Sequence, residues 1–162
     1  MKLWQKDKTS SKEVERFTIG RDQQMDMYMA RFDVLGSLAH IRMLESIGLL
    51  KANELGLLST ELKNIYDKIM AGEFVLEDGV EDIHSQVELE LTKKRGEVGK
   101  KIHSGRSRND QVLLDIKLYL RHEIEEIVNA LKDLFDLLIS QSEKFKEYLL
   151  PGYTHLQLAM PS

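Results

Sequence analysis

The residues best suited to chemistry lie in one short stretch, Lys100–Val112, with the order Lys-Lys-Ile-His-Ser-Gly-Arg-Ser-Arg-Asn-Asp-Gln-Val. It combines four cations with an imidazole, small hydrogen-bonding side chains and a flexible glycine, and a long amphipathic pattern begins at Gln111. A helix N-terminus attracts anions through its unpaired N–H groups and its dipole, and arginine binds a carboxylate through two parallel hydrogen bonds. The stretch therefore predicts an anion-binding loop. The alternative is that Ser107, Asn109 or Asp110 only caps the helix and that the cations are solvated.

A second reactive group follows a predicted turn at Pro151-Gly152. The run Tyr153–Gln157 presents a hydroxyl, an imidazole and an amide in a short non-helical segment. His155 there titrates near neutral pH and could exchange a proton with a substrate. A histidine with no chemical role is the alternative.

His84 and Glu88 are spaced i and i+4 on a predicted helix, so they share one face. Two ligands are too few for a metal site, and the sequence offers no third candidate nearby. A simple polar pair is the preferred interpretation, and no metal is expected.

Composition limits the class of protein. The chain has 162 residues, a formal net charge of −4, 31% charged residues and no cysteine, which suits a soluble protein of a reducing cytoplasm. No signal peptide or 18-residue apolar run is found, so no membrane segment is expected. Seven Lys or Arg lie between Lys93 and Arg108 with one acid, Glu97. This basic island lacks interleaved aromatics, so nucleic-acid binding is only weakly indicated.

Apolar periodicity predicts an all-α fold. Residues 1–19 are expected to form a loosely ordered arm anchored by Leu3 and Trp4. Helices are predicted over 22–47, from Ser59 or Thr60 to Gly72, and over 80–95 with Val80, Ile83, Val87 and Leu91 buried. The buried stripe predicted for the first helix is Met25, Tyr28, Met29, Phe32, Leu35, Ala39, Met43 and Ile47, a methionine-rich face typical of a core rather than of a cofactor site.

The most regular pattern runs over 111–148, where apolar residues repeat every three or four positions: Leu113, Ile116, Leu120, Ile124, Ile127, Leu131, Leu134 and Leu138. Such a helix is roughly 55 Å long, too long for a globule of this size to cover. It therefore requires partner helices from other subunits, from a longer chain, or from both. The expected organisation is an N-terminal helical domain over 1–110, followed over 111–162 by the first long helix of an incomplete central bundle.

Two strings carry a family resemblance. Lys101–Val112 resembles the signature of the argininosuccinate lyase family within the fumarase/aspartase superfamily, and Pro151–Gln157 looks like a second signature of that family. Shorter similar segments are Glu81–His84, Gly36–His40 and Leu3-Trp4. The resemblance is collinear over essentially the whole chain.

The resemblance implies reversible elimination of argininosuccinate to arginine and fumarate, with no cofactor. The aci-carboxylate formed after proton loss needs fixed positive charge and N–H donors. The matching positions assign His155, with Thr154, to acid–base catalysis. They assign substrate binding to Ser107, Arg108, Asn109, Thr154, Gln157 and His84. The family also implies a cytoplasmic homotetramer whose active sites combine segments of three subunits.

Two departures from the family pattern stand out. The serine-bearing loop that supplies the second acid–base group would lie beyond Ser162, so the 162-residue chain alone is expected to be inactive. Phe17–Arg21 replaces the usual serine contact to the amino-acid end of the substrate. The alternatives are a sister lyase acting on adenylosuccinate or aspartate, and a helical module that binds nucleic acid or a partner.

Overall fold

The structure is a computed structural model that describes residues 14, 17, 20–149 and 151–161. The chain divides into two compact units, Met1–Leu120 and Arg121–Ser162. Helices make up most of the described residues, which confirms the all-α prediction, and a small two-stranded hairpin is added to them. The predicted anchors Leu3 and Trp4, and part of the segment Phe17–Arg21, lie outside the described residues.

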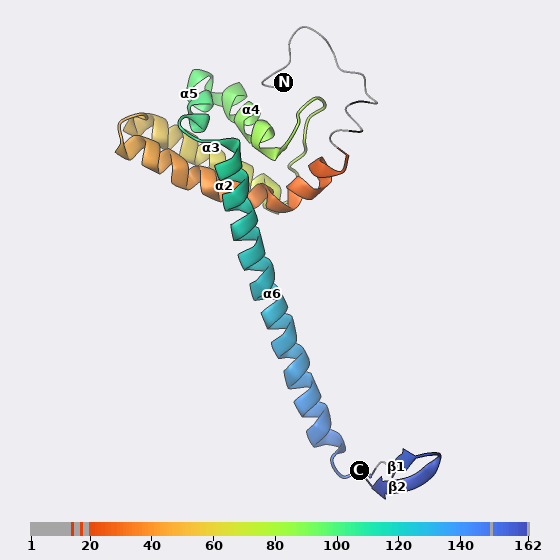
Figure 1. The fold of residues 1–162 in the computed structure, drawn as a ribbon. Coiled ribbons are helices and arrows are strands. Elements are labelled where there is room, and N and C mark those ends of the chain that lie inside the picture. The colour runs from red at the N-terminus through yellow and green to blue at the C-terminus, as the bar shows by residue number, and fades with distance from the viewer. Residues whose placement is uncertain (1–13, 15–16, 18–19, 150, 162) are drawn as a thin grey trace. The chain divides into compact units, whose positions relative to one another are not determined.

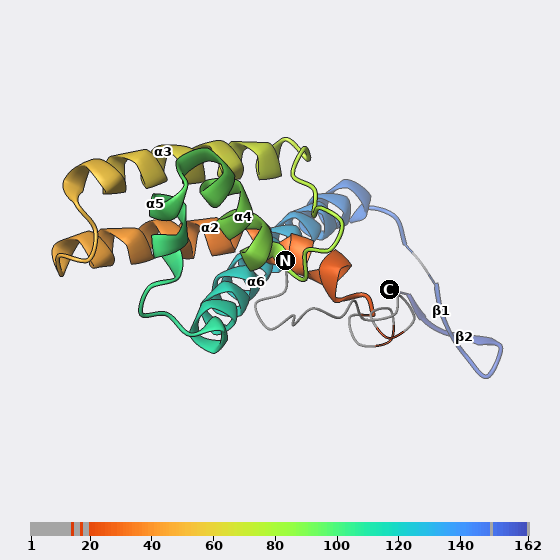
Figure 2. The ribbon, with the colours of Figure 1, turned by 90° about the horizontal axis from the view of Figure 1, so that it is seen from above.

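The first unit is built from α2 (Asp22–Ser46), α3 (Ala52–Met70), α4 (Ile83–Arg95), the short α5 (Glu97–Lys100), the 3-10 turn η1 (Lys101–His103) and the start of α6 (Arg108–Phe145). Figures 1 and 2 both show α2 and α3 running side by side, and α4 packs on both of them. Their shared core consists of Ala30, Val34, Ile41, Leu44, Leu50, Leu58, Leu62, Ile65, Phe74, Ile83, Val87, Leu91 and Ile102. These three helices form the base from which α6 begins.

The buried face of α2 differs from the predicted one. Met25, Tyr28, Leu35, Met43 and Ile47 are exposed, and of the predicted stripe Phe32 alone is buried. The helix instead buries a face that carries smaller and polar side chains: Ala30, Asp33, Val34, Gly36, Ser37, Ile41 and Leu44. The prediction was wrong because α2 is apolar on two sides, and small residues allow the closer helix packing.

Gly36 shows how close that packing is. A Cβ added to Gly36 would lie 2.9 Å from Cδ2 of Leu114 in α6, inside van der Waals contact. The glycine that costs α2 about 1 kcal/mol of helix propensity therefore allows α6 to approach it. This approach brings the start of α6 against the middle of α2.

The other helix boundaries are partly as predicted. The start of α3 at Ala52 is well before the predicted Ser59 or Thr60, because the Glu54 carboxylate accepts a hydrogen bond from the Lys51 N–H at 2.9 Å and closes the first turn. The prediction that Met70 of α3 points inward is also wrong, since that side chain is 55% exposed. The buried stripe predicted for α4 is confirmed, and Gly96 ends that helix as expected.

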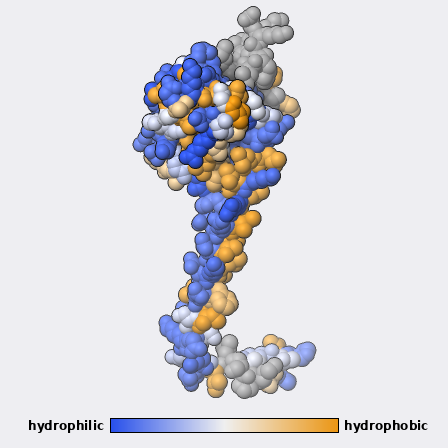
Figure 3. All heavy atoms as spheres, turned by 90° about the vertical axis from the view of Figure 1, so that its left-hand side faces the viewer, coloured by the Kyte–Doolittle hydropathy of each residue, from blue (hydrophilic) through white to orange (hydrophobic). Residues whose placement is uncertain are grey.

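Helix α6 has 38 residues, and begins and ends three residues before the predicted limits. Its predicted apolar seam is exposed along the described chain, as Figure 3 shows by the hydrophobic side chains gathered along one side of the helix. The exposed fractions include 60% for Ile124, 58% for Leu131 and 59% for Leu138. Among the described residues the seam is therefore uncovered, as the sequence predicted.

The second unit ends in an antiparallel hairpin of β1 (Pro151–Thr154) and β2 (Gln157–Pro161). The segment is non-helical, as predicted, but the turn falls at His155-Leu156 and not at Pro151-Gly152, which belongs to β1. None of the described helices is both long and apolar enough to span a bilayer.

Candidate functional site

Arg108 is the first residue of α6, and its side chain reaches the first turn of α4. Its Nη2 donates to Ser85 Oγ at 3.1 Å, and its Nη1 lies 3.4 Å from Oδ1 of Asp82. Asp82 caps α4 by accepting the Ser85 N–H at 2.7 Å. The Arg108 side chain is 29% exposed and its guanidinium has five N–H donors, so it retains donors for another anion. Two helix N-termini and one arginine thus meet at a partly open point.

Ser107 and Asn109 flank Arg108 and are exposed. Ser107 Oγ accepts the Asn109 N–H at 3.2 Å, and the Ser107 carbonyl accepts the Gln111 N–H at 3.2 Å. The capping role considered for Ser107 is therefore present. Since the Asn109 side chain has no described hydrogen bond within the chain, its amide is available to a ligand.

Most of the basic island is paired with acids of the same chain. Lys94 and Arg95 bind Glu61, and the remaining pairs are Lys93–Glu77, Lys100–Glu97, Lys101–Glu54 and Arg108–Asp82. The sequence suggested that Lys100 and Lys101 join Arg108 in an anion-binding loop. Their ion pairs show that they do not. The pairing also argues against nucleic-acid binding, which needs cations free to neutralise phosphates.

Behind Arg108 lies a buried polar cluster drawn from three helices. Asp33 of α2 accepts hydrogen bonds from His84 Nδ1 of α4, at 2.9 Å, and from the Gln111 side chain of α6. Asp115 of α6 places Oδ2 3.7 Å from the same His84 nitrogen. All four side chains are at most 5% exposed. The polar partner of His84 is thus Asp33 and not Glu88.

Burial governs the charges of this cluster. Burial, followed by the negative charge of Asp33, raises the pKa of Asp115 to about 7, against the opposing effect of His84 and Arg106. Burial acts to lower the pKa of His84, but the hydrogen bond and charge of Asp33 outweigh it and raise that pKa. The cluster therefore favours a protonated His84 and a protonated Asp115.

Asp33, His84 and Asp115 also have the donor types of a metal site, with candidate ligand atoms all within 4.8 Å of one another. Sequence reasoning missed this set because it looked only along α4. The positive charge of Arg106 acts on both carboxyl groups and would oppose a bound cation.

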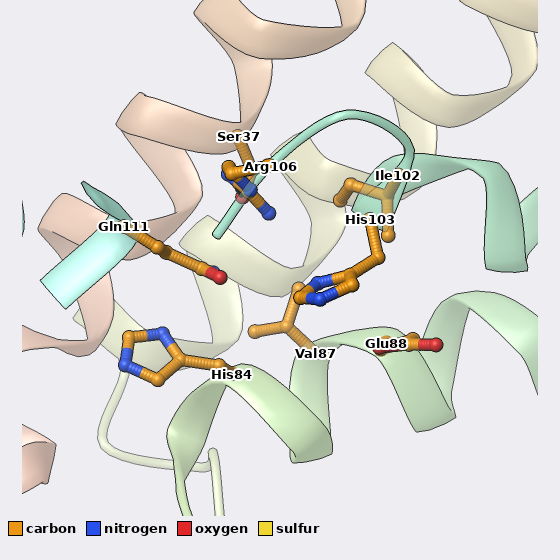
Figure 4. A pocket seen from close by; sticks show the side chains of 8 residues that line it. All are labelled: Ser37, His84, Val87, Glu88, Ile102, His103, Arg106 and Gln111. Atoms are coloured by element: carbon orange, nitrogen blue, oxygen red, sulfur yellow. Dashed lines mark hydrogen bonds between the residues drawn. The ribbon is translucent and has the colours of Figure 1, made fainter. Parts of the chain in front are cut away.

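Figure 4 shows the pocket that adjoins the cluster, where His84, Gln111, Arg106 and Ser37 approach from separate elements. Arg106 Nη1 donates to Ser37 Oγ at 3.2 Å, and the pKa of the guanidinium is lowered by burial. His40 Nε2 lies 2.9 Å from the Ser104 carbonyl and ties the loop to α2. These contacts fix the loop that enters α6.

The other predicted site residues occupy the hairpin of the second unit. Thr154 and Gln157 pair across the two strands, His155 lies in the turn between them, and all three are exposed. His155 and Leu156 have φ values of 50° and 63°, a left-handed conformation that two-residue hairpin turns require and that L side chains rarely adopt. The structure thus groups His84, Ser107, Arg108 and Asn109 in one unit, and Thr154, His155 and Gln157 in the other.

Asp33, Gln111 and Asp115 were missed by sequence reasoning. A signal existed for the two carboxyl groups, because each interrupts an apolar run: Phe32-Asp33-Val34 in α2 and Leu114-Asp115-Ile116 in α6. A charged residue on a buried helix face is rare unless it is paired. The sequence could not show that the two lie together.

Comparisons with known proteins identify the relatives of this chain. The sequence model of a family described as lyase matches residues 5–162. Proteins named argininosuccinate lyase are similar to this chain: that of Phocaeicola vulgatus is 63% identical over 161 residues, and that of Bacteroides fragilis 64% over 161 residues. That of Trichlorobacter lovleyi is 46% identical over 162 residues. Each alignment covers 99% of this chain but only 35–36% of the relative, so the chain spans about a third of the relatives' length.

Proposed function

The chain belongs to the lyase family, and on this basis we propose that it forms the N-terminal part of an argininosuccinate lyase. The reaction splits argininosuccinate reversibly into arginine and fumarate. A cytoplasmic location and a place in arginine biosynthesis belong to the same proposal.

The observation that carries the proposal is the position of Arg108. Its guanidinium lies where α4 and α6 both begin, and two helix dipoles add to its charge. A carboxylate is the ligand best matched to this point, because arginine can bind both of its oxygens. Argininosuccinate offers such carboxylates on its succinyl group.

The chemistry assigns each residue a task. When a base removes a proton from the carbon beside a succinyl carboxylate, negative charge develops on that carboxylate, and Arg108 with the Asn109 amide stabilises it. The electron pair then forms the double bond of fumarate as the carbon–nitrogen bond breaks, and the guanidino nitrogen leaves as arginine. His155, with its neighbour Thr154, exchanges a proton with the substrate. Ser107, Gln157 and His84 contact the substrate.

The uncovered seam of α6 supports a homotetrameric assembly. Apolar side chains from Leu113 to Leu138 are exposed over most of the helix. A stripe of this length is far more than a monomer normally leaves in water. Partner helices from the rest of a longer chain and from other copies would cover it, and the assembly would bring Thr154 and His155 of one copy to Arg108 of another.

The test is a hybrid enzyme in which these 162 residues replace the matching part of the Bacteroides fragilis relative, which is 64% identical there. Fumarate release from argininosuccinate is followed by ultraviolet absorbance, with adenylosuccinate and aspartate as competing substrates. The hybrid should act on argininosuccinate, and His155→Asn should reduce kcat at least 100-fold.

Two results would contradict the proposal. A folded hybrid that prefers adenylosuccinate or aspartate would assign the chain to a sister lyase. Near-normal turnover of the His155→Asn hybrid would remove that residue from proton transfer. The 162-residue chain alone serves as the negative control and should release no fumarate.

A further inference from the structure

The Asp33 carboxylate accepts hydrogen bonds from the first turns of two helices, α4 and α6. It accepts from Gln111, which lies three residues after Arg108 in α6, and from His84, which precedes Ser85 in α4. Ser85 and Asp82 in turn hold the Arg108 guanidinium. One fully buried carboxylate thus links the turn that carries Arg108 to the turn that orients its side chain.

A second buried carboxyl group beside Asp33 creates an electrostatic conflict. Asp33 and Asp115 are both 0% exposed and lie in the same cluster. Two ionised carboxylates in one buried site repel each other at a high cost in free energy, so one of them takes a proton. Within the described chain, Asp33 Oδ2 and both oxygens of Asp115 are buried without a hydrogen-bond partner. A proton held between the two groups gives one oxygen of each residue a partner.

We propose that Asp33 is a positioning residue for Arg108, and that it serves as the single anion of the cluster because Asp115 is a neutral carboxylic acid whose O–H donates a hydrogen bond to Asp33. The raised pKa of Asp115 agrees with this, as does the raised pKa of His84, whose positive charge Asp33 then balances. The positioning of Arg108 rests on the proposed function, whereas the shared proton does not.

The charges around the cluster come from every element packed against it. They are Asp26 and Asp33 of α2, Asp82, His84 and Glu88 of α4, Arg108 and Asp115 of α6, and Arg106 of the loop. Arg106 acts on both Asp33 and Asp115. A neutral Asp115 leaves the buried part with one carboxylate and one imidazolium, a balanced pair. A divalent cation in place of the proton would instead require both carboxylates to be ionised.

The same chemical change at the two positions should therefore have opposite results. Asp115→Asn replaces a neutral acid by a neutral amide that can still donate to Asp33. Asp33→Asn removes the only anion and leaves the His84 imidazolium buried without its partner, which is strongly destabilising. At pH 6 the 162-residue chain should keep or raise its melting temperature in Asp115→Asn, because the amide needs no proton uptake on folding, and should lose at least about 5 °C in Asp33→Asn.

Should Asp33→Asn fail to fold, the charge of His84 gives an independent measurement in the folded chain. The ¹⁵N shifts of the His84 ring should be those of an imidazolium at pH 6 in Asp115→Asn. A neutral ring at pH 6 in that variant would overturn the shared proton. Equal destabilisation by both substitutions would also overturn it. So would a rise in melting temperature with Zn²⁺ or Mn²⁺ that Asp115→Asn abolishes, because a metal site would then explain the cluster.

Positioning is tested separately in the hybrid enzyme. Asp33→Asn should raise KM for argininosuccinate about tenfold more than Asp115→Asn does, because a displaced Arg108 weakens substrate binding. Equal KM values in two folded variants would overturn the positioning role. A parent hybrid that releases no fumarate, with the stability difference intact, would instead contradict the proposed function alone.

Discussion

Asp82 performs two tasks with one oxygen, and two substitutions can separate them. Its Oδ1 accepts the Ser85 N–H at 2.7 Å as the cap of α4, and lies 3.4 Å from Nη1 of Arg108. Asparagine caps a helix as well as aspartate does, but has no charge to offer the guanidinium. Alanine removes both contacts.

The structure sets the size of each loss. The ion pair is partly open, with side chains 29% and 21% exposed, so it contributes no more than about 1 kcal/mol. The cap contributes about 1 kcal/mol. Asp82→Asn should therefore lower the free energy of unfolding by at most about 1 kcal/mol, and Asp82→Ala by about 1–2 kcal/mol.

Urea denaturation followed by circular dichroism measures both variants. Asp78→Ala is the matched control, because this exposed aspartate in the same connector has no hydrogen bond or ion pair in the described structure and should change stability by less than about 0.5 kcal/mol. Equal destabilisation by Asp82→Asn and Asp82→Ala would refute a separate contribution of the cap, and an Asp82→Ala variant as stable as the control would refute both contributions.

Two further predictions concern packing and pH. A Cβ on Gly99 would lie 2.5 Å from the Leu91 backbone carbon, so Gly99→Ala should lower the free energy of unfolding by about 1–3 kcal/mol. Gly56→Ala, where a Cβ would meet nothing within 4 Å, should raise the free energy of unfolding by about 1 kcal/mol. Urea denaturation compares the two variants, and equal effects would refute the close contact at Gly99. The folded chain holds a proton on Asp115 up to a pKa of about 7, whereas the unfolded chain loses it near 3.8, so this group's contribution to stability is lost as pH rises from about 4 to 7. This loss of unfolding free energy is at most about 4 kcal/mol. Urea denaturation of Asp115→Asn between about pH 4 and 7 should not show the loss. A pH dependence equal to that of the parent chain would contradict the raised pKa of Asp115.

The sequence predicted elements whose apolar pattern allows only one interpretation. The stripe of α4 and the long seam of α6 are examples, because the predicted apolar residues of each recur every three or four positions. It failed for α2, where Met25, Tyr28 and Met43 suggest one face and Ala30, Val34 and Ile41 form the other. Which face is buried depends on α3, α4 and α6, and so on contacts that no local pattern records.

The candidate site divides in the same way. Ser107, Arg108 and Asn109 were found because loop chemistry and the start of a helix are local features. Asp33 and Asp115 lie far apart in sequence and meet only through the packing of α6 on α2 beside Gly36. Lys100 and Lys101 were wrongly included in the predicted anion-binding loop. Their acidic partners, Glu97 and Glu54, lie outside that loop, so the loop sequence alone does not show the pairing.

The proposed function depends most directly on Arg108, which lies at the meeting point of two helix N-termini and is proposed to bind a carboxylate of the substrate. The most direct measurement is kcat/KM for argininosuccinate in the hybrid enzyme carrying Arg108→Lys, beside Lys100→Ala as a cation of the same island that pairs with an exposed glutamate. Arg108→Lys should reduce kcat/KM by about 10- to 100-fold, because lysine cannot make the two parallel hydrogen bonds, and Lys100→Ala should leave it unchanged. Equal kcat/KM values for the two folded variants would contradict the account.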